Sequence, residues 1–342
     1  MQKSIIKYLE QNPESSSLEI FEGVNSDKSY ATLKRELSKL IDDNYLEIVG
    51  RGKGTKYRIS KIYNLIYPLN LEEYFRKEAD ERIINNQYNF QLINEILSQV
   101  PIFTSQELET LEDLQKLFLN KTSSKESVEY KKEMERLSID LSWKSSQIEG
   151  NTYSLLETEE LLKYKMTAAG KTKDEATMLL NHKDAIDFLI TNAQYVTPLS
   201  TRSIEEIHSI LIKELGIERN IRIRKVGISG TNYSPLDNEF QIIEALRDMC
   251  ILINKKESPF EKAILALILI SYIQPFADGN KRTARIISNA ILLDNNCCPI
   301  SYRTVETLHY KKAMLLFYEL NNLSAVKKMF IEQYEFAVKN YF

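Results

Sequence analysis

The sequence predicts a mainly α protein: an all-helical core with a short β-hairpin flap, preceded by a small domain of helices and one further hairpin. Three observations support this prediction. Apolar residues recur every three to four positions over almost the whole chain after Ser105, as they do on one face of a helix. Period-two alternation, which is typical of strands, appears in 45–59. Residues 223–235 combine Val, Ile, Gly, Thr and Tyr, as a hairpin does.

Length and composition limit the class of protein. The chain has 342 residues, which predicts two or three domains. Its formal net charge of −3 means that any basic surface must be local. Three cysteines without a CxxC pair are typical of a reducing compartment, and the N-terminus lacks the apolar segment of a secretion signal. The longest apolar run, Ala263–Ile273, is too short to span a membrane, so we expect a cytoplasmic protein with no membrane partner.

Residues 1–60 form the first predicted domain. Helices are expected over 3–10, 17–23 and 29–42, where apolar residues lie at helical spacing between breaks such as Asn12-Pro13. Strands are expected over 45–49 and 56–59, on either side of a glycine-rich turn. Three short helices and a glycine-tipped hairpin in this order resemble a winged helix-turn-helix.

A winged helix-turn-helix places its recognition helix in the major groove of double-stranded DNA. Between Lys28 and Ser60 there are eight basic and four acidic residues, a local excess of +4. The candidate DNA-binding residues on the third helix and the wing are Ser29, Tyr30, Thr32, Lys34, Arg35, Arg51 and Lys53. The alternative is a domain that docks another protein or forms a homodimer.

The string QPFADGNKRTAR at 274–285 has the composition of a phosphate-binding turn. Pro275 ends the preceding apolar helix, and a glycine-bearing turn leads into the next helix. Backbone N–H groups and the dipole at such a helix start favour an anion. Arg282 and Arg285 lie on one face of that helix, and Asp278 is placed to hold Mg²⁺ that bridges phosphates.

This string resembles the motif of the Fic family, HPFxDGN(G/K)RxxR, and departs from it only at the first position. The resemblance implies an all-helical core with a hairpin flap and, as activity, transfer of AMP from ATP to a hydroxyl of a target protein, with the chain itself as one possible target. It implies that Asp278 binds Mg²⁺. It implies that ATP phosphates are bound by Gly279, Asn280, Lys281, Arg282 and Arg285. Lysine at 281 also occurs in a branch with members that transfer phosphate, so the transferred group stays open.

Two further segments extend the resemblance over roughly 105–310. Ser145, Glu149 and Gly150 match the family's inhibitory motif, whose glutamate would pair with Arg285 where the γ-phosphate belongs. The flap carries Val226, Gly227, Ile228, Gly230, Thr231 and Tyr233, and it would dock the target segment by β-augmentation. We therefore expect a linker with helical content over 61–104 and a Fic domain over 105–342, with the inhibitory helix near 130–150.

Glutamine occupies the position of the family's catalytic histidine. Gln274 cannot accept a proton from the attacking hydroxyl, and loss of a general base costs ~10²–10⁴ in rate. Three explanations stay open: an engineered variant, a natural member that binds nucleotide without chemistry, or a member in which Glu149 serves as base for another reaction. We expect an autoinhibited adenylyltransferase impaired at Gln274. The alternative is a non-catalytic regulator that binds nucleotide and acts through the winged helix.

Overall fold

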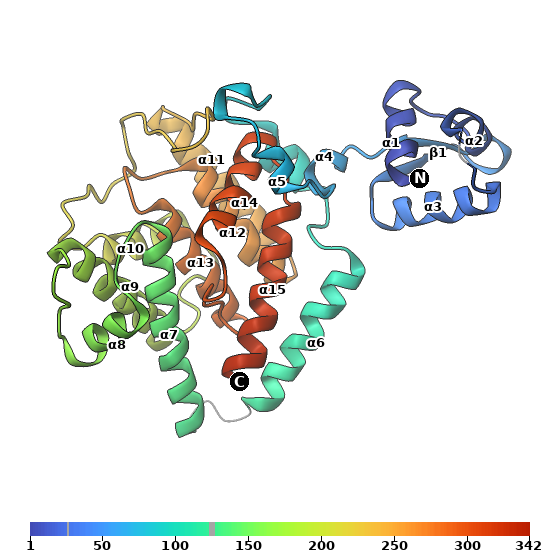
Figure 1. The fold of residues 1–342 in the computed structure, drawn as a ribbon. Coiled ribbons are helices and arrows are strands. Elements are labelled where there is room, and N and C mark those ends of the chain that lie inside the picture. Colours follow the sequence, from blue (N-terminus) through green and yellow to red (C-terminus); the bar gives the residue numbers. More distant parts are fainter. Residues whose placement is uncertain (26, 123–126) are drawn as a thin grey trace. The chain divides into compact units, whose positions relative to one another are not determined.

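The computed structural model describes residues 1–25, 27–122 and 127–342; it also leaves the side chain of Lys53 undescribed. The chain forms two compact units. Unit 1 comprises Met1–Leu69 and Leu320–Ser324, and unit 2 comprises Asn70–Glu319 and Ala325–Phe342. Figure 1 shows the elements coloured along the sequence.

Unit 1 contains three helices, a hairpin and a short fourth helix. Its elements are α1 (Gln2–Gln11), α2 (Ser17–Val24), α3 (Tyr30–Asp42), β1 (Leu46–Val49), the 3-10 turn η1 (Gly52–Gly54), β2 (Lys56–Ile59) and α4 (Tyr63–Ile66). The side chains of Ser16 and Ser29 cap α2 and α3 by accepting backbone hydrogen bonds. The strands pair antiparallel, with Leu46 opposite Ile59. The first three helices and the two strands occur in the order that the sequence predicts, and the winged helix-turn-helix assignment stays a prediction.

A cluster of buried apolar residues packs the first three helices and the hairpin of unit 1 together. Leu33, Leu37 and Leu40 of α3 lie on one face at helical spacing and are buried. They belong to the same cluster as the buried residues of α1 and of the hairpin, among them Leu9 and Tyr57. Lys34 and Arg35 lie outside this buried stripe and are exposed, and Lys34 Nζ lies 5.7 Å from the centroid of the Tyr30 ring.

Unit 2 begins with short elements and continues in longer helices. The short ones are α5 (Leu71–Tyr74), the 3-10 turn η2 (Ala79–Glu81) and the π-helical segment η3 (Leu92–Leu97). The longer ones up to the site are α6 (Ser105–Lys121), α7 (Val128–Ile148), α8 (Leu155–Tyr164), α9 (Lys173–Thr191), α10 (Thr201–Leu211) and α11 (Glu239–Lys255). Ser or Thr caps most of these helices, and several caps are completed by a glutamate three residues on.

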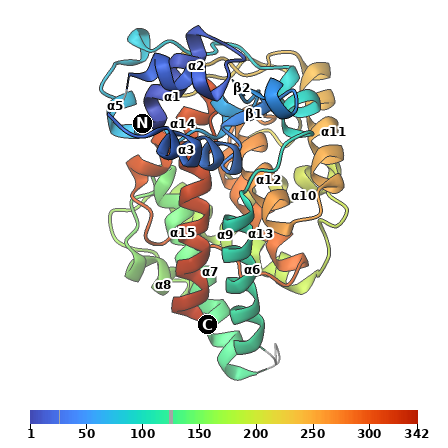
Figure 2. The same cartoon turned by 90° about the vertical axis from the view of Figure 1, so that its right-hand side faces the viewer.

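The centre of unit 2 is the helix pair α12 (Pro259–Ile273) and α13 (Asn280–Asp294). Every residue of α12 from Ala263 onward is buried, as expected for a helix that is apolar on all sides. α13 contacts α12, α10, α9 and α7. The last helices are α14 (Thr307–Leu320) and α15 (Ser324–Tyr341). Both views show α15 alongside α6 (Figure 2), where Lys327 and Glu107 form an ion pair at 2.9 Å.

The predicted β-hairpin at 223–235 is wrong in one respect: this flap contains no paired strands. It has no regular secondary structure on either side of a turn at Gly230, which has a φ of +87° and separates a first limb, 225–229, from a second limb, 231–235. The second limb bonds to a different partner, because Ser234 N donates to Asn86 O at 2.9 Å and Gln87 pairs with Ser234 in an isolated parallel bridge. The local composition predicted a hairpin, but the second limb forms its backbone hydrogen bond with the distant segment that contains Asn86.

Across the described parts of the chain, no helix combines the length and the apolar character needed to cross a membrane.

Candidate nucleotide-binding site

The loop between α12 and α13 is held in two left-handed backbone conformations. Gln274 has a φ of 51° where α12 ends, and Gly279 has a φ of 81° where α13 begins. Pro275 prevents α12 from continuing. Only glycine adopts the second conformation without strain, and a Cβ at 279 would also lie 3.2 Å from Cγ2 of Ile212. The loop can therefore approach α10 closely.

A histidine that the sequence analysis did not identify anchors this loop. The ring of His208 in α10 stacks on Phe276 at 3.6 Å between centroids, and its Nε2 donates a hydrogen bond to Asp278 O at 3.0 Å. Burial lowers the pKa of His208 to about 4, so the ring is neutral at pH 7. His208 and Asp278 are 70 positions apart in the sequence, and no local sequence pattern predicts their contact.

The N-terminus of α13 has the features of an anion site. Its N-cap is Gly279, which offers no side-chain cap to the first N–H groups of the helix. Lys281 and Arg282 project from the first turn, and Arg282 is held by Leu211 O at 3.3 Å and by Asp278 Oδ2 at 3.8 Å. Uncapped N–H groups, the helix dipole and two cations together favour phosphate.

The carboxylate of Glu149 lies beside two cations of α13, Arg285 and Lys281. Arg285 Nη2 donates to Glu149 Oε1 at 2.8 Å, and Lys281 Nζ lies 3.8 Å from Oε2. Burial alone would raise the pKa of Glu149, but the charges of Arg285 and Lys281 outweigh it, and the net pKa is lowered. Ser145 holds the same arginine through Oγ at 2.7 Å and its carbonyl at 2.9 Å. Gly150 follows with a φ of +101° and turns the chain away from α7.

The amide of Gln274 is used in structural hydrogen bonds. Its Oε1 accepts from Asn280 Nδ2 at 3.0 Å, and its Nε2 donates to Ser271 O at 2.6 Å. Asn280 in turn bonds both N and O of Phe276 at 2.8 Å. The buried guanidinium of Arg222 donates to Gln274 O at 2.6 Å. The side chain at 274 thus stabilises the loop and presents no basic atom to the cavity.

Asp278 is suited to a hard cation. One carboxylate oxygen accepts from Gly279 N at 2.6 Å, yet the side chain remains 70% exposed. A single carboxylate combined with phosphate oxygens is a common arrangement for Mg²⁺. Asp278 therefore fits as the protein ligand of a nucleotide-bound magnesium ion.

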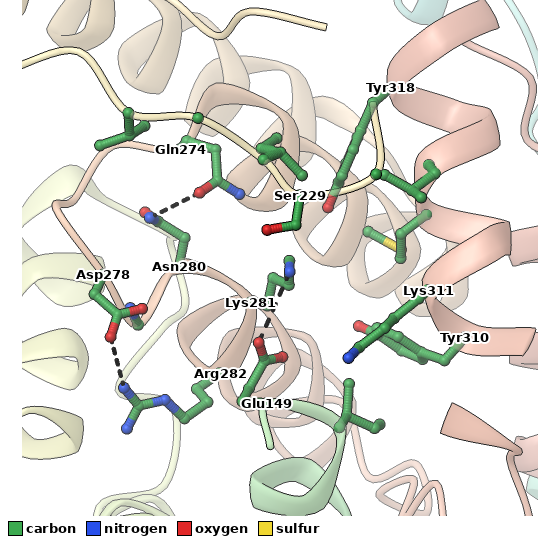
Figure 3. Close-up of a pocket in the computed structure, with 18 of the residues that line it drawn as sticks. Glu149, Ser229, Gln274, Asp278, Asn280, Lys281, Arg282, Tyr310, Lys311 and Tyr318 are labelled. Carbon is green, nitrogen blue, oxygen red and sulfur yellow. Dashed lines mark hydrogen bonds and ion pairs between the residues drawn. The ribbon is translucent and has the colours of Figure 1, made fainter. Parts of the chain in front are cut away.

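These elements enclose a cavity of about 510 Å³. Of the predicted residues, those that line it are Glu149, Val226, Gly227, Ile228, Gly230, Gln274, Asp278, Gly279, Asn280, Lys281 and Arg282. Arg285 and Ser145 lie buried behind Glu149, while Thr231, Tyr233 and Gly150 are not in the lining. Figure 3 shows Tyr310, Lys311 and Tyr318 on the α14 side of the cavity, and Ser229 of the flap. None of these four was among the site residues predicted from the sequence, because none belongs to the loop motif or to the flap residues singled out.

The candidate DNA-binding residues lie in unit 1, apart from this loop in sequence. Ser29 is the N-cap of α3 and bonds Thr32, while the Tyr30 hydroxyl bonds Ser17 at 2.7 Å, so these three residues have structural roles. Lys34, Arg35 and Arg51 are exposed. The side chain of Lys53 lies outside the described residues.

Comparison with known proteins agrees with this geometry. Residues 198–292, which include the loop and the flap, match the Fic/DOC family model. The chain carries a Fic/DOC family domain. It is 27% identical over 200 residues to the protein adenylyltransferase fic-1 of Caenorhabditis elegans, a match that covers 57% of this chain and 39% of the relative. It is 31% identical over 168 residues to the protein adenylyltransferase Fic of Nematostella vectensis, covering 46% and 38%. The match spans about two fifths of the length of these relatives.

Solved structures show the same fold for the Fic domain. A segment of Fic-1 from C. elegans superposes with a TM-score of 0.60 at 22% identity, covering 69% of this chain and 72% of that one. A Fic domain containing signaling protein from Bacteroides thetaiotaomicron superposes with a TM-score of 0.55 at 19% identity, covering 68% and 96%. The mostly helical architecture predicted from the sequence is confirmed.

Proposed function

We propose that the chain is a Fic-type protein adenylyltransferase that binds ATP and Mg²⁺, is autoinhibited by Glu149 and is impaired at Gln274. One observation carries this proposal. The uncapped start of α13, with Lys281, Arg282 and Asp278 around it, opens into a cavity that the flap borders. Polyphosphate, metal and an acceptor segment would all have places around one reacting phosphorus.

The reaction needs an in-line attack. The acceptor hydroxyl oxygen forms a bond to the α-phosphorus, the bond to pyrophosphate breaks, and the hydroxyl proton must leave. Gly279, Lys281 and Arg282 would bind and orient the phosphates through N–H groups and positive charge. Mg²⁺ held by Asp278 would neutralise charge on the phosphates. Gln274 has no atom that accepts the proton, so this step is slow.

Glu149 supports an inhibited state. Its carboxylate is paired with Arg285 and lies near Lys281, so the γ-phosphate would bring a second negative charge to the same cations. Two like charges within a few ångströms repel, and ATP would bind weakly or in an unproductive pose.

The first limb of the flap could take the acceptor segment. Within the described residues, the backbone of 225–229 makes no hydrogen bond to another part of the chain. Its free N–H and C=O groups resemble an open strand edge, which an extended peptide can pair with.

The test is transfer of label from ATP by four proteins: the chain as given, Gln274→His, Glu149→Gly and the double variant. Labels on the α- and on the γ-phosphate, in separate reactions, distinguish AMP transfer from phosphate transfer. We expect α-label on protein chiefly with the double variant. Binding of MgATP to the same four proteins is measured by calorimetry. Absence of both binding and transfer in all four proteins would refute the proposal.

A second candidate is a regulator in which nucleotide binding changes the interactions of unit 1. It is favoured by the exposed Lys34 and Arg35 on α3 and by the local excess of basic residues. Binding of duplex DNA should weaken as salt rises and be lost in Arg35→Glu. Absence of DNA binding even at low salt would leave the docking or homodimer alternative.

A further inference from the structure

The second limb of the flap is held along its length by residues 80–86, which lie outside the matched family region. Asn232 Nδ2 donates to Asp80 Oδ1 at 2.8 Å, and Ser234 N donates to Asn86 O at 2.9 Å. At the base of this limb, Tyr233 stacks on Tyr272 with centroids 4.7 Å apart, and its hydroxyl donates to Tyr272 O at 3.1 Å. Within the residues that the structure describes, the backbone of the first limb, 225–229, makes no such hydrogen bond.

Arg82 makes the contact at the flap tip. Its Nη2 donates to Gly230 O at 2.6 Å. The same guanidinium forms two hydrogen bonds to the carboxylate of Glu319, from Nε at 3.0 Å and from Nη2 at 2.9 Å. Its Nη1 donates to Lys77 O at 3.0 Å, and the guanidinium carbon lies 4.9 Å from the centroid of the Phe75 ring. Every nitrogen of this side chain is therefore engaged.

The Arg82–Glu319 pair is a rigid base for that contact. The side chain of Arg82 is 6% exposed and that of Glu319 is fully buried. Tyr74 OH donates a further hydrogen bond to Glu319 at 2.7 Å. A planar guanidinium that is held in a bidentate pair has one orientation, so its remaining donor defines where the Gly230 carbonyl lies.

This contact connects two walls of the cavity. Gly230 and its neighbour Ser229 line the cavity from the flap, and Tyr318, which precedes Glu319 in α14, lines it from the other side. By bonding Gly230 O and Glu319 together, Arg82 sets the separation between the flap tip and α14. The free first limb then lies over the cavity while the tip stays fixed.

We propose that Arg82 is a positioning residue of the Fic site: it fixes the flap tip so that an acceptor segment paired with the first limb places its hydroxyl over the α-phosphate. The acceptor role rests on the proposed adenylyl transfer, whereas the position of the flap does not. Asp80 assists by holding Asn232. Segment 79–86 is thus a functional part of the site and more than a connection to unit 1.

Hydrogen–deuterium exchange of the Tyr233 and Ser234 amides, which donate to Thr231 Oγ1 at 3.1 Å and to Asn86 O at 2.9 Å, tests the position of the flap without nucleotide. Arg82→Lys keeps a positive charge beside Glu319 but cannot satisfy three acceptors in one plane, so the fold should persist. Asn232→Ala removes the neighbouring contact and leaves the Arg82–Glu319 pair intact. We expect exchange in the flap to be faster by roughly tenfold in Arg82→Lys, the loss of one charge-assisted hydrogen bond, and by less in Asn232→Ala. Glu72→Gln, which removes an ion pair between α5 and Lys312 of α14 away from the flap tip, is the control.

The same substitutions are then placed in the Gln274→His, Glu149→Gly background, where label transfer is measured against acceptor concentration. We expect KM for the acceptor to rise several-fold in Arg82→Lys while the Kd of MgATP stays the same. Unchanged flap exchange in Arg82→Lys overturns the positioning role. Faster exchange with unchanged acceptor KM overturns the link to the acceptor. If the parent background transfers nothing, the proposed function fails, and flap exchange alone decides whether Arg82 positions the tip.

Discussion

Replacing Glu149 by glutamine should have opposite effects on the free protein and on its complex with ATP. The change keeps the shape of the side chain and removes one negative charge. In the free protein the carboxylate accepts from Arg285 at 2.8 Å and lies 3.8 Å from Lys281 Nζ. The amide oxygen can still accept from Arg285, which also keeps its two bonds to Ser145. The loss is thus the charge-assisted part of one partly buried contact, about 2 kcal/mol, below the 3–5 kcal/mol of a buried pair that is fully broken.

In the complex, the same change removes repulsion between Glu149 and the incoming phosphate. Two unit charges 5 Å apart interact by about 3 kcal/mol at an effective dielectric constant of 20. Part of this is offset because Arg285 and Lys281 already neutralise the carboxylate. We therefore expect MgATP to bind about 2 kcal/mol more tightly, roughly 30-fold in Kd.

Calorimetry of MgATP and thermal unfolding with and without nucleotide measure both effects. Without ligand, Glu149→Gln should have a melting temperature a few degrees below that of the original chain. Saturating MgATP should raise the melting temperature of Glu149→Gln by more than it raises that of the original chain. The ion pair lowers the pKa of Glu149 in the folded state. Its contribution to the free energy of unfolding is therefore fully present above about pH 4.3 and is lost only as the pH falls through the lower folded-state pKa. Measurements at pH 7 thus include the whole contribution. Glu159→Gln removes an exposed ion pair with Lys163 and should change neither quantity measurably. Equal Kd values for MgATP in Glu149→Gln and the original chain would refute the reasoning.

Three further predictions concern the loop. Gly279→Ala puts a Cβ on a residue with a φ of +81°, and this Cβ would lie 3.3 Å from His208 Nε2. We therefore expect the free energy of unfolding to fall by about 1–3 kcal/mol and MgATP binding to weaken. An unchanged melting temperature would contradict this expectation. His208 has a folded-state pKa of about 4, so the unfolded chain binds its proton first and stability falls as the pH drops from about 6.5 to 4, by up to about 3 kcal/mol. Urea unfolding of His208→Gln should show a correspondingly shallower pH dependence, and an identical slope would exclude the assignment. Asp278→Asn should abolish the dependence of ATP affinity on Mg²⁺ in calorimetry, with weak metal-free binding retained; full Mg²⁺ dependence would mean that another group holds the ion.

Sequence patterns were sufficient where local physics determines the structure. The third helix of unit 1, predicted over 29–42, spans Tyr30–Asp42, because its apolar spacing and its serine cap are both local signals. The strands predicted over 45–49 and 56–59 are Leu46–Val49 and Lys56–Ile59, on either side of the glycine-rich turn. The loop at 274–285 was found for the same reason, since its chemistry lies in consecutive residues.

Local sequence patterns do not predict contacts between segments that are distant in the sequence. The flap was predicted to pair with itself, but its second limb bonds Asn86 and Asp80, about 150 residues earlier. Neither the stacking of His208 on Phe276 nor the contact of Arg82 with Gly230 has a periodic signal. A buried arginine is visible in a sequence only as a charged residue, and its acceptors become known once the chain is folded.

The two bonds from Ser145 to Arg285 have a consequence for how readily the site could change state. If the Glu149 side chain rotated away, Oγ and the carbonyl of Ser145 would still hold Nε and Nη2 of the guanidinium. An unrestrained arginine carries about 2 kcal/mol of rotamer entropy that ordering would remove. A phosphate arriving at Arg285 would therefore meet a donor whose direction is already set, and one glutamate rotamer, with no helix movement, would be enough to exchange carboxylate for phosphate.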